Sequence, residues 1–536
     1  MDLTQEVQAW IADDPDPKTA AQLQQWLDSN NEVELRASFS GFLQFGTAGL
    51  RGPIRPGPSG MNRAVVGRTA AGIAAYMKER NLTSVVIGRD ARYGSEDFTF
   101  ETAQIMSGAG MKVYVLPRPL PTPVLAFATN ELKCDVGIMV TASHNPPQDN
   151  GYKVYLGGTV DGIHYRGSQI VSPTDESIAQ KIDSITSLAS QPRGKEWTVL
   201  GEEVVDKYVG ITAALAHKPG NLKIVYTAMH GVGTETLQQV FHKAGFPQPI
   251  LVESQAKPDP DFPTVAFPNP EEPGAIDLAL ETARTFDADL VIANDPDADR
   301  CAAAVKDPVK GWRMLRGDEL GVILGETIAR ATTQGILANS IVSSSILSKI
   351  AAHYKLDFKE TLTGFKWLAK IDGLTFGYEE ALGYAVDAIT VNDKDGISAA
   401  IKLAQIATDL AAQNKTLLDL LDEVWVRHGF HATEQISIRL SDLSQVGVIM
   451  GNLRSNSPKE IAGRSVTSID DLAKPKDGLP PTDGLRIWLD GGIRIIIRPS
   501  GTEAKMKCYI EAIAKDSATA QAVLDQLRAP LKELLS

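Results

Sequence analysis

The sequence predicts an α/β protein: three consecutive α/β domains with mixed sheets and a smaller C-terminal α+β domain, arranged around a central cleft. Two observations support this fold class. Short apolar runs alternate with helical stretches through most of the 536 residues, which is typical of mostly parallel sheets covered by helices. From about residue 430 the rhythm changes to alternating polar and apolar strands and a final helix, which indicates a domain of another kind.

Each expected element follows from its local pattern. Short apolar runs bounded by turn formers are expected to be strands, and longer amphipathic stretches are expected to be helices. In the α/β part these are strand 84–90, helix 95–110, strand 112–117, strand 134–140, strand–turn–helix 222–245, strand and acidic loop 288–300, and strand and helix 340–354. In the C-terminal part they are strands within 433–440, 485–500 and 505–512, and a helix at 517–534.

Polar linkers set the expected domain boundaries. Such stretches occur at residues 187–197 and 306–312, and the pattern changes after 425–435. Because domains of ordinary size divide at exposed polar segments, we predict four of them. They are residues 1–200, 201–312, 313–428 and 429–536.

The composition is that of a soluble globular protein, with 43% hydrophobic and 22% charged residues. The net charge of −13 argues against nucleic acid or an anionic membrane as a partner, because an acidic surface repels both. No apolar run approaches the ~20 residues of a membrane span, and the acidic N-terminus does not resemble a signal peptide. Three widely spaced cysteines form neither a disulfide framework nor a zinc pattern, so we expect a cytoplasmic protein.

The loop after the predicted strand 134–140 carries the first candidate group. Its sequence, TASHNPPQDNGYK (residues 141–153), combines a serine with turn-forming residues. Ser143 is therefore either an ordinary turn residue or a nucleophile presented at a strand end. The G-x-S-x-G pattern of hydrolases is absent around it. His144 could serve as its base, although adjacent side chains usually diverge in an extended loop, and Lys153 could fold back over it.

Three aspartates at alternate positions follow the next predicted strand, in NDPDADR (residues 294–300). Alternate side chains of an extended backbone point the same way, so Asp295, Asp297 and Asp299 should converge and require a hard cation such as Mg²⁺ or Ca²⁺. An EF-hand is excluded, because Arg300 and Lys306 stand where it needs a glycine and a glutamate. The alternative is a solvated acidic turn, but strand ends of this kind bind ligands in α/β proteins, so we favour a metal site.

Two further loops are weaker signals on their own. GYEEALGY (residues 377–384) either begins a helix, whose dipole favours acidic residues, or offers a carboxylate to sugar hydroxyls. RPSGTEAK (residues 498–505) either surrounds a phosphate with a guanidinium, hydroxyls and backbone N–H groups or is a plain turn between strands. HGVG (residues 230–233) lacks the third glycine of a dinucleotide-binding loop.

Together, the four loops resemble the active-site loops of one family, the α-D-phosphohexomutases, which include phosphoglucomutase and phosphomannomutase. They occur in the family's order, one in each predicted domain. FGTAGLRG (residues 45–52) is similar to the family's opening motif, and NDKDG (residues 392–396) to its third-domain signature. The resemblance spans roughly residues 40–515 and is closest to the branch with animal phosphoglucomutase/phosphopentomutase enzymes and many bacterial mutases.

The resemblance implies an isomerase that moves a phosphoryl group between the 1- and 6-positions of a sugar through a phosphoserine and a bisphosphate. It implies that Ser143, Asp295, Asp297 and Asp299 bind Mg²⁺, and that glucose 1,6-bisphosphate or an analogous sugar bisphosphate is the activator. The implied catalytic residues are Ser143, Lys153, His144 and Arg51. The implied substrate-binding residues are Arg300, Lys366, Glu379, Glu380, Arg498, Ser500, Gly501, Thr502 and Lys505. We expect a monomer or a homodimer.

The sugar loop departs from the hexose-specific pattern. Those members read G-E-x-S-G, and Ala381 stands at the place of their serine. Losing one neutral hydrogen bond changes discrimination by ~1 kcal/mol, so glucose stays the expected substrate while mannose and pentose phosphates are alternatives.

Three other functions fit the sequence less well. A kinase should carry a nucleotide-binding glycine loop, and neither common form is present. A metal-dependent sugar phosphatase would not need a second phosphate site in its last domain. A carbohydrate-sensing protein without activity should have lost Ser143 or an aspartate, and the chain retains them all.

Overall fold

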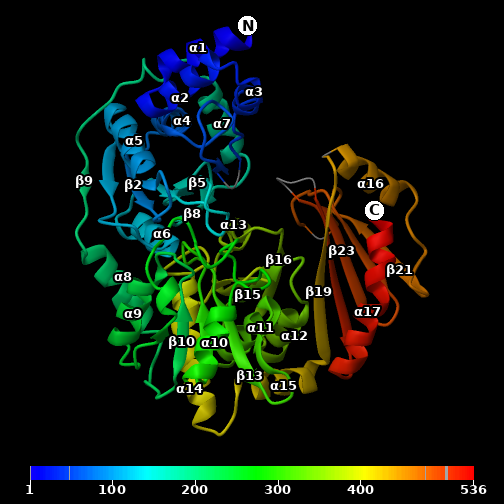
Figure 1. Ribbon diagram of the computed structural model, residues 1–536. Coiled ribbons are helices and arrows are strands. Elements are labelled where there is room, and N and C mark those ends of the chain that lie inside the picture. Colours follow the sequence, from blue (N-terminus) through cyan, green and yellow to red (C-terminus); the bar gives the residue numbers. More distant parts are fainter. Residues whose placement is uncertain (1, 47–48, 443, 477, 501–504, 536) are drawn as a thin grey trace. The chain divides into compact units, whose positions relative to one another are not determined.

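The computed structural model describes residues 2–46, 49–442, 444–476, 478–500 and 505–535. The chain forms two compact units (Figure 1). The first unit comprises Met1–Leu315, Ala369–Asp372 and Ala381–Ala412. The second comprises Arg316–Leu368, Gly373–Glu380 and Gln413–Ser536. This division does not test the four predicted domain boundaries.

Three helices open the first unit: α1 (Leu3–Asp13), α2 (Pro17–Asp28) and α3 (Glu32–Ser38). Val7, Leu23 and Leu35 form the buried core between them. The carboxylate of Asp13 accepts hydrogen bonds from the Ser187 hydroxyl and from the backbone N–H groups of Leu188 and Ala189, which joins these helices to a distant stretch of the same unit.

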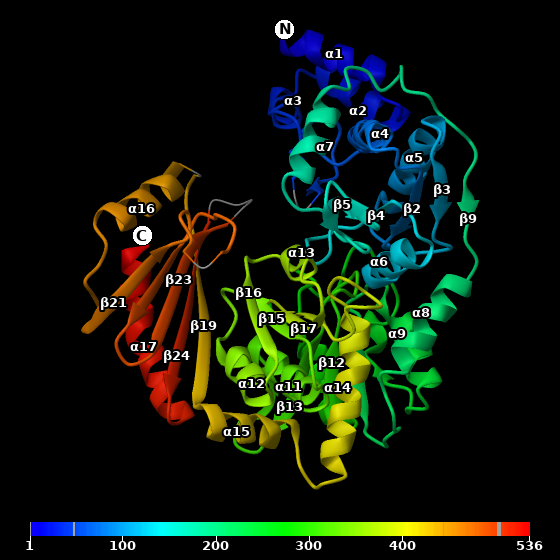
Figure 2. The same ribbon diagram turned by 180° about the vertical axis from the view of Figure 1, so that it is seen from behind.

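The first sheet is mixed and runs in the order β1-β5-β4-β2-β3-β9, with β8 paired to β5. Its strands are β1 (Leu50–Pro53), β2 (Ser84–Arg89), β3 (Lys112–Val115), β4 (Val136–Val140), β5 (Asp149–Leu156), β8 (Ser168–Gln169) and β9 (Thr198–Val199). Its helices are α4 (Arg63–Glu79), α5 (Ser95–Gly108), α6 (Thr122–Glu131) and α7 (Thr174–Asp183). In both views α5 lies above the strands and α6 below them (Figures 1 and 2), which confirms the predicted α/β layering.

Strand pairing brings two loop regions to one edge of this sheet. β2 and β4 are parallel, with Arg89 opposite Val140. Because parallel strands end at the same edge, the segment after β2 and the predicted serine loop after β4 start side by side. β4 and β5 are antiparallel, so the serine loop returns directly into β5, where Lys153 lies opposite Met139. β6 (Thr159–Val160) and β7 (Ile163–His164) form a small separate hairpin.

The second sheet of the first unit runs in the order β11-β10-β12-β13-β14. Its strands are β10 (Ile224–Thr227), β11 (Ile250–Leu251), β12 (Leu290–Ala293), β13 (Ala302–Asp307) and β14 (Gly311–Met314). The accompanying helices are α8 (Glu203–Ala213), α9 (Gly233–Lys243), the 3₁₀ turn η1 (Glu253–Gln255), α10 (Asp277–Thr285) and α14 (Gly396–Ala411). β10 and β12 are parallel with Thr227 opposite Ala293, so the HGVG loop and the acidic loop share one sheet edge.

The second unit begins with three parallel strands in the order β16-β15-β17: β15 (Ile336–Ser340), β16 (Asp357–Thr361) and β17 (Leu374–Glu379). Helices α11 (Gly317–Arg330), α12 (Ile346–Tyr354), α13 (Phe365–Leu368) and α15 (Leu417–His428) belong to this part. β18 (Gly383–Ala385) belongs to the first unit, where Gly383 bridges Arg300.

The predicted strand at the start of 340–354 is wrong in position. The strand is β15, which ends at Ser340, and residues 341–345 form a turn. Ile341 and Val342 are apolar and β-branched, which suits a strand, but they pack into a hydrophobic cluster with Ile496 and Tyr509 instead. Tertiary packing therefore overrides the local preference.

The C-terminal part of the second unit is a six-stranded antiparallel sheet in the order β19-β24-β23-β22-β21-β20. The strands are β19 (Phe430–Arg439), β20 (Glu460–Ile461), β21 (Arg464–Asp471), β22 (Leu485–Leu489), β23 (Ile493–Pro499) and β24 (Lys505–Ala514). The final helix α17 (Ser517–Leu534) covers one face of this sheet (Figure 2) and has the predicted bounds. The sequence did not predict β20, β21 or α16 (Ser444–Ser455).

A turn with two glycines connects β22 to β23. Gly491 and Gly492 have φ values of +79° and +76°, in the left-handed region. Leu489 pairs with Ile493, so three residues, Asp490, Gly491 and Gly492, connect the two strands. Glycine adopts a positive φ at little steric cost.

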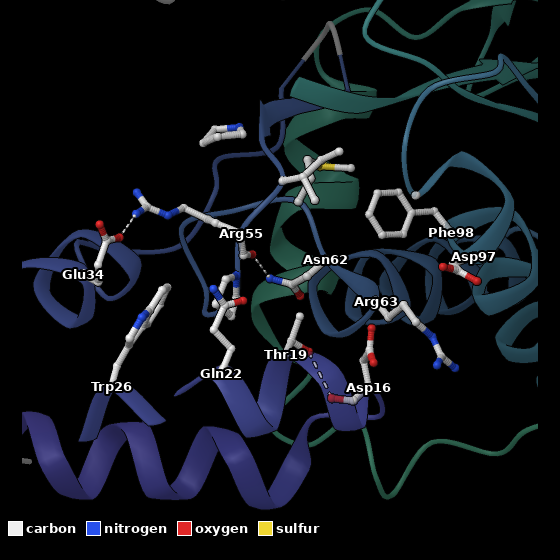
Figure 3. A pocket seen from close by; sticks show the side chains of 15 residues that line it. Asp16, Thr19, Gln22, Trp26, Glu34, Arg55, Asn62, Arg63, Asp97 and Phe98 are labelled. Carbon is white, nitrogen blue, oxygen red and sulfur yellow. Dashed lines mark hydrogen bonds and ion pairs between the residues drawn. The ribbon is translucent and has the colours of Figure 1, made fainter. Parts of the chain in front are cut away.

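A cavity of about 610 Å³ lies beside the N-terminal helices (Figure 3). Thr19, Gln22 and Trp26 of α2 line one side, and Asn62, Arg63 and Phe98 line the other. None of the predicted site residues lines it. In the described part of the chain, no helix combines the length with the apolar composition needed to cross a membrane.

Candidate active site

Ser143 sits in a strained turn at the end of β4. Its φ is +53°, in the left-handed region, which costs an L-residue roughly 1–2 kcal/mol. It is 3% exposed, and its hydroxyl donates to Oδ2 of Asp295 at 2.7 Å. A strained residue whose side chain faces a buried carboxylate is a candidate reactive group rather than an incidental turn residue.

His144 does not diverge from Ser143 as the extended-loop argument expected. Its Nδ1 lies 3.1 Å from the Ser143 Oγ. The left-handed turn at Ser143 breaks the alternation of side chains on which that expectation depended. Burial and the nearby Arg300 and Arg51 cations lower the pKa of His144 well below its usual value, so the imidazole is neutral.

The three aspartates converge as predicted. Asp295, Asp297 and Asp299 are each at most 1% exposed, and each offers an oxygen within 4.8 Å of those of the other two. They come from the loop after β12, which ends beside β10 at the same sheet edge. Burial and the two neighbouring carboxylates raise the pKa of Asp295 to about 8.

Lys153 balances part of this negative charge. Its Nζ donates to Asp297 Oδ2 at 2.7 Å and to Asp299 Oδ2 at 2.8 Å. Burial alone would lower the pKa of Lys153, but the two carboxylates raise it. Lys153 therefore contacts the acidic loop, and its possible position over Ser143 stays a prediction.

Arg51 and Arg300 add cations at the rim of the cluster. The Arg51 guanidinium donates to Asn145 Oδ1 at 3.1 Å, within the serine loop. The Arg300 Nε lies 4.0 Å from Asp295 Oδ2, and its backbone N–H donates to Asp295 Oδ1 at 3.0 Å. Both arginines thus lie beside the reactive loops, as the resemblance implied.

The donor set of the cluster fits a hard divalent cation. Within the described residues, Oδ1 of Asp297 and Oδ1 of Asp299 are buried and accept no hydrogen bond. Buried carboxylate oxygens without a partner are costly, and a cation coordinated by oxygen ligands is the usual compensation. Asp295, Asp297 and Asp299 therefore fit a Mg²⁺ site, with the Ser143 Oγ adjacent.

Two residues at the cluster were missed by sequence reasoning. The Thr122 hydroxyl donates to Asp297 Oδ2 at 2.6 Å, and the Lys394 Nζ lies 3.2 Å from Asp299 Oδ2. Lys394 lies inside the NDKDG motif, so its presence in a recognised motif was a usable signal. Thr122 begins α6 and nothing in its local sequence marks it.

The predicted sugar-loop carboxylates lie in the second unit. Glu379 ends strand β17, so the alternative that it starts a helix is wrong. It is 8% exposed, and its Oε1 accepts a hydrogen bond from the Gly364 N–H at 2.6 Å. Lys366 lies nearby in sequence, in the short helix α13.

Glu380 is held by the serine that ends β15 and by a second serine that follows the strand. Its Oε2 accepts hydrogen bonds from Ser340 Oγ at 3.1 Å and Ser343 Oγ at 2.9 Å. Burial and the neighbouring Glu379 raise the pKa of Glu380 to about 7. The turn at residues 341–345, where the sequence predicted a strand, brings the Ser343 hydroxyl to this carboxylate.

The predicted phosphate loop joins β23 to β24. Arg498 lies on β23 opposite Lys507, and the Ser500 N–H donates to the carbonyl of Lys505 at 2.8 Å. Gly501 and Thr502 lie outside the described residues. Arg498, Ser500 and Lys505 therefore lie at one end of the β23–β24 pair.

The HGVG segment, which lacks the pattern of a dinucleotide-binding loop, packs against the backbone of the acidic loop. The Val232 N–H donates to the Pro296 carbonyl at 2.8 Å. A Cβ on Gly231 would lie 2.3 Å from Pro296 Cα and 2.4 Å from its carbonyl oxygen. The preceding Met229 and His230 both have left-handed φ values, of +49° and +60°. Close backbone packing thus fixes the acidic loop.

Comparison with protein families finds four consecutive matches. They are the phosphoglucomutase/phosphomannomutase alpha/beta/alpha domain I at residues 43–189, domain II at 204–311, domain III at 316–428 and the C-terminal domain at 451–529.

Individual proteins show the same likeness. A Haemophilus influenzae protein described as "Probable phosphomannomutase" is 49% identical over 482 residues, which cover 89% of this chain and 98% of that protein. The phosphopentomutase of Mus musculus is 34% identical over 572 residues, covering 96% of this chain and 90% of that protein. The crystal structure of the Paramecium phosphoprotein pp63/parafusin, a phosphoglucomutase in its open form, shares the fold with a TM-score of 0.71. It is 20% identical and covers 93% of this chain and 95% of that chain.

Gly231→Ala should displace the acidic loop, because the added methyl would overlap the Pro296 backbone. We expect a loss of about 1–3 kcal/mol of folding free energy, as for other overpacked sites, and weaker Mg²⁺ binding. Melting temperatures measured over a series of MgCl₂ concentrations report both effects. Gly210→Ala is the matched control, since it lies in helix α8 with no atom within 4 Å of the new methyl. If both variants melt alike and respond to Mg²⁺ alike, Gly231 does not fix the loop.

Proposed function

The chain belongs to the phosphoglucomutase/phosphomannomutase family, and on that premise we propose how its residues divide the reaction between them. It is a phosphosugar mutase, an intramolecular phosphotransferase of the isomerase class. The family resemblance and the four-domain α/β architecture predicted from the sequence are thereby confirmed. We propose domain boundaries near residues 200, 312 and 428 within that architecture.

Ser143 carries the transferred phosphoryl group. The observation behind this assignment is the 2.7 Å contact between its hydroxyl and Asp295, within a buried group of three aspartates. Phosphoryl transfer needs positioning and neutralisation of charge more than any other contribution from the protein, and a serine fixed against such a cluster meets the first need.

Ser143, Asp295, Asp297 and Asp299 would hold Mg²⁺. When bound, this ion supplies positive charge that stabilises the transferring phosphoryl group. The charge of Lys153, between Asp297 and Asp299, adds to it from the protein's own side. We assign to Lys153 the proton-transfer role that the family resemblance implies.

His144 and Arg51 orient the serine loop. The neutral His144 ring lies against the Ser143 Oγ, and Arg51 holds Asn145 of the same loop. Arg300 places a further cation beside Asp295, where it would contact a substrate oxygen. These three groups would keep Ser143 aligned while the phosphoryl group is transferred.

Residues of the second unit would bind the sugar hydroxyls and the remote phosphate of the substrate. Glu379 binds sugar hydroxyls, and Glu380 and Lys366 lie close to it in sequence. The remote phosphate binds the loop that contains Arg498, Ser500, Gly501, Thr502 and Lys505. A bisphosphate intermediate can then turn and present either end to Ser143, and glucose 1,6-bisphosphate acts as the activator. We propose a cytoplasmic monomer or homodimer.

The substrate range is relaxed. Glucose 1-phosphate is the main substrate, and mannose 1-phosphate or ribose 1-phosphate is also turned over. Ala381 removes one side-chain hydroxyl from the sugar loop, and a site with fewer fixed polar groups rejects near-isosteres poorly. The relatives at 49% and 34% identity, which carry the names phosphomannomutase and phosphopentomutase, support a family in which sugar choice varies.

Ser143→Ala should abolish isomerisation, with turnover lower by about 10⁴-fold or more, as for the loss of a nucleophile. The melting temperature should change little, because Asp295 keeps its bond to the Arg300 N–H. A coupled assay for glucose 6-phosphate measures the activity. Ser190→Ala, at an exposed loop serine, is the control and should be fully active. Turnover by Ser143→Ala near the wild-type rate would refute the assignment.

Removing the metal should stop turnover and lower thermal stability. A ligand that binds only the folded state stabilises it by mass action, by about 2.7 kcal/mol at a concentration of 100 Kd. EDTA-treated protein should therefore be inactive, and added MgCl₂ should restore activity and raise the melting temperature. Asp297→Asn should require more MgCl₂ for both effects, whereas Asp287→Asn, at an exposed position, should not. Turnover in excess EDTA, with no melting shift on adding MgCl₂, would rule out the metal site.

Substrate discrimination should be weak. With glucose 1,6-bisphosphate present, kcat/KM values for glucose, mannose and ribose 1-phosphates should show a second sugar within about 10³-fold of glucose. A preference for glucose beyond that over both others corresponds to about 4 kcal/mol of transition-state discrimination. Such a result would mean that other contacts replace the missing serine, and the relaxed range would be wrong.

A further inference from the structure

Arg92 lies under the serine loop and holds its backbone. Its side chain is 1% exposed, and its guanidinium donates hydrogen bonds to four main-chain carbonyls of that loop. The acceptors and donor–acceptor distances are Ser143 O (2.7 Å), Asn145 O (2.6 Å), Pro146 O (2.8 Å) and Asp149 O (3.2 Å). A single side chain thus contacts the loop from the reactive serine to its far end.

The strand order explains why Arg92 reaches this loop. It follows β2, which is parallel to β4, so both segments leave the sheet at the same edge. Asp90 fixes Arg92 in turn. Its Oδ1 accepts hydrogen bonds from the Arg92 N–H at 3.0 Å and the Ser95 hydroxyl at 2.7 Å, and its Oδ2 lies 3.3 Å from the Arg92 Nε. The Phe262 ring lies on the guanidinium, 4.9 Å from ring centre to Cζ.

The serine loop makes only a few backbone hydrogen bonds, among them those from the Asn145 N–H to the Ala142 carbonyl and from the Asp149 N–H to the Pro146 carbonyl, both at 3.1 Å. Pro146 and Pro147 have no N–H to donate, and neither helix nor sheet continues through the loop. Its carbonyls point inward, where an unpaired polar group is unfavourable. The planar guanidinium satisfies several of them at once, which a single lysine ammonium cannot do in the same geometry.

Among the hydrogen bonds of the described residues, none joins Arg92 to the reacting atoms. Arg92 therefore acts through the backbone of the loop. It donates to the Ser143 carbonyl, while the Ser143 Oγ points to Asp295. Holding the Ser143 carbonyl restrains the peptide plane that follows its Cα, and with it the backbone from which the side chain projects at a φ of +53°. Ser143 is thus held at two points: Arg92 holds its carbonyl, and Asp295 holds its Oγ.

We propose that Arg92 is a further positioning residue of the nucleophile, in addition to His144 and Arg51: its four carbonyl contacts hold the backbone of Ser143 in the left-handed turn from which Oγ reaches the aspartate cluster. This inference rests on the proposed role of Ser143. Arg92 lies outside the four loops that mark the family, yet it would affect catalysis. It would position the serine, whereas other loops bind the sugar.

The test is Arg92→Lys in the full chain with MgCl₂. The lysine keeps a positive charge for Asp90 but loses the four-point contact. We expect kcat and the rate at which glucose 1,6-bisphosphate phosphorylates Ser143 to fall together by about 10²-fold, because small misplacements of a reacting group cost that much. KM should stay within about twofold, since sugar and remote phosphate bind elsewhere. Phosphorylation is followed by intact mass.

Arg63→Lys is the matched control, because Arg63 pairs with the buried Glu101 at 2.8 Å and does not contact the serine loop. It should lower the melting temperature without slowing phosphorylation. Should Arg92→Lys fail to fold, the double variant Asp90→Asn/Arg92→Met removes both buried charges and should show the same loss of kcat at unchanged KM. Rates are compared well below each melting temperature.

Two negative results have different meanings. If wild-type protein takes up phosphate on Ser143 and Arg92→Lys does so at a rate within twofold, the positioning role is wrong and the proposed function stands. If wild-type Ser143 takes up no phosphate from the bisphosphate, the proposed function fails and this inference fails with it.

Discussion

Three carboxylates buried in one short loop constrain the whole first unit. Asp295, Asp297 and Asp299 lie too close together and too far from water to carry their charges unaided. A buried charge that loses its partner typically costs about 3–5 kcal/mol. The chain answers with cations from distant segments: Lys153 from β5, Lys394 from the start of α14, and Arg300 from the loop itself.

These cations do not neutralise all of the negative charge of the three aspartates. The charge that remains is what a metal ion would bind. Lys153 contacts one oxygen of Asp297 and one of Asp299, while the other oxygen of each is buried and accepts no hydrogen bond from the part of the chain that the structure describes. A lysine that neutralised the cluster fully would leave no site for a metal. The unsatisfied oxygens therefore connect the electrostatics of folding with the chemistry of phosphoryl transfer.

Four of the non-glycine residues with left-handed φ values lie in loops around the same cluster, and others lie elsewhere in the described chain. Ser143, Met229, His230 and Ala298 all have left-handed φ values, and all lie in the loops that form or support the site. Strain of this kind persists only where the surroundings over-determine the backbone. Here Gly231 packs on the Pro296 backbone and Arg92 holds the serine loop, so both loops are restrained by contacts within the protein.

Sequence reasoning succeeded where the physics is local. The alternation of side chains in NDPDADR predicted a convergent acidic cluster, and turn residues after β4 predicted that Ser143 would be presented at a strand end. It failed where contacts cross the fold. Arg92 and Thr122 reach the site because parallel strands and a helix start bring them there, and the strand at 336–340 was misplaced because Ile341 and Val342 pack against another sheet. The closeness of His144 to Ser143 depended on one left-handed residue that a sequence pattern does not reveal.

The most direct test of the account is to locate the phosphate. Protein is incubated with isotopically labelled glucose 1,6-bisphosphate and MgCl₂, digested, and mapped by mass spectrometry, before and after addition of unlabelled sugar monophosphate. The account predicts one phosphate per chain on the peptide that contains Ser143, and its transfer to the sugar when the monophosphate is added. Phosphate on another residue, or a phosphoserine that does not discharge to the sugar, would contradict the claim that Ser143 carries the transferred group.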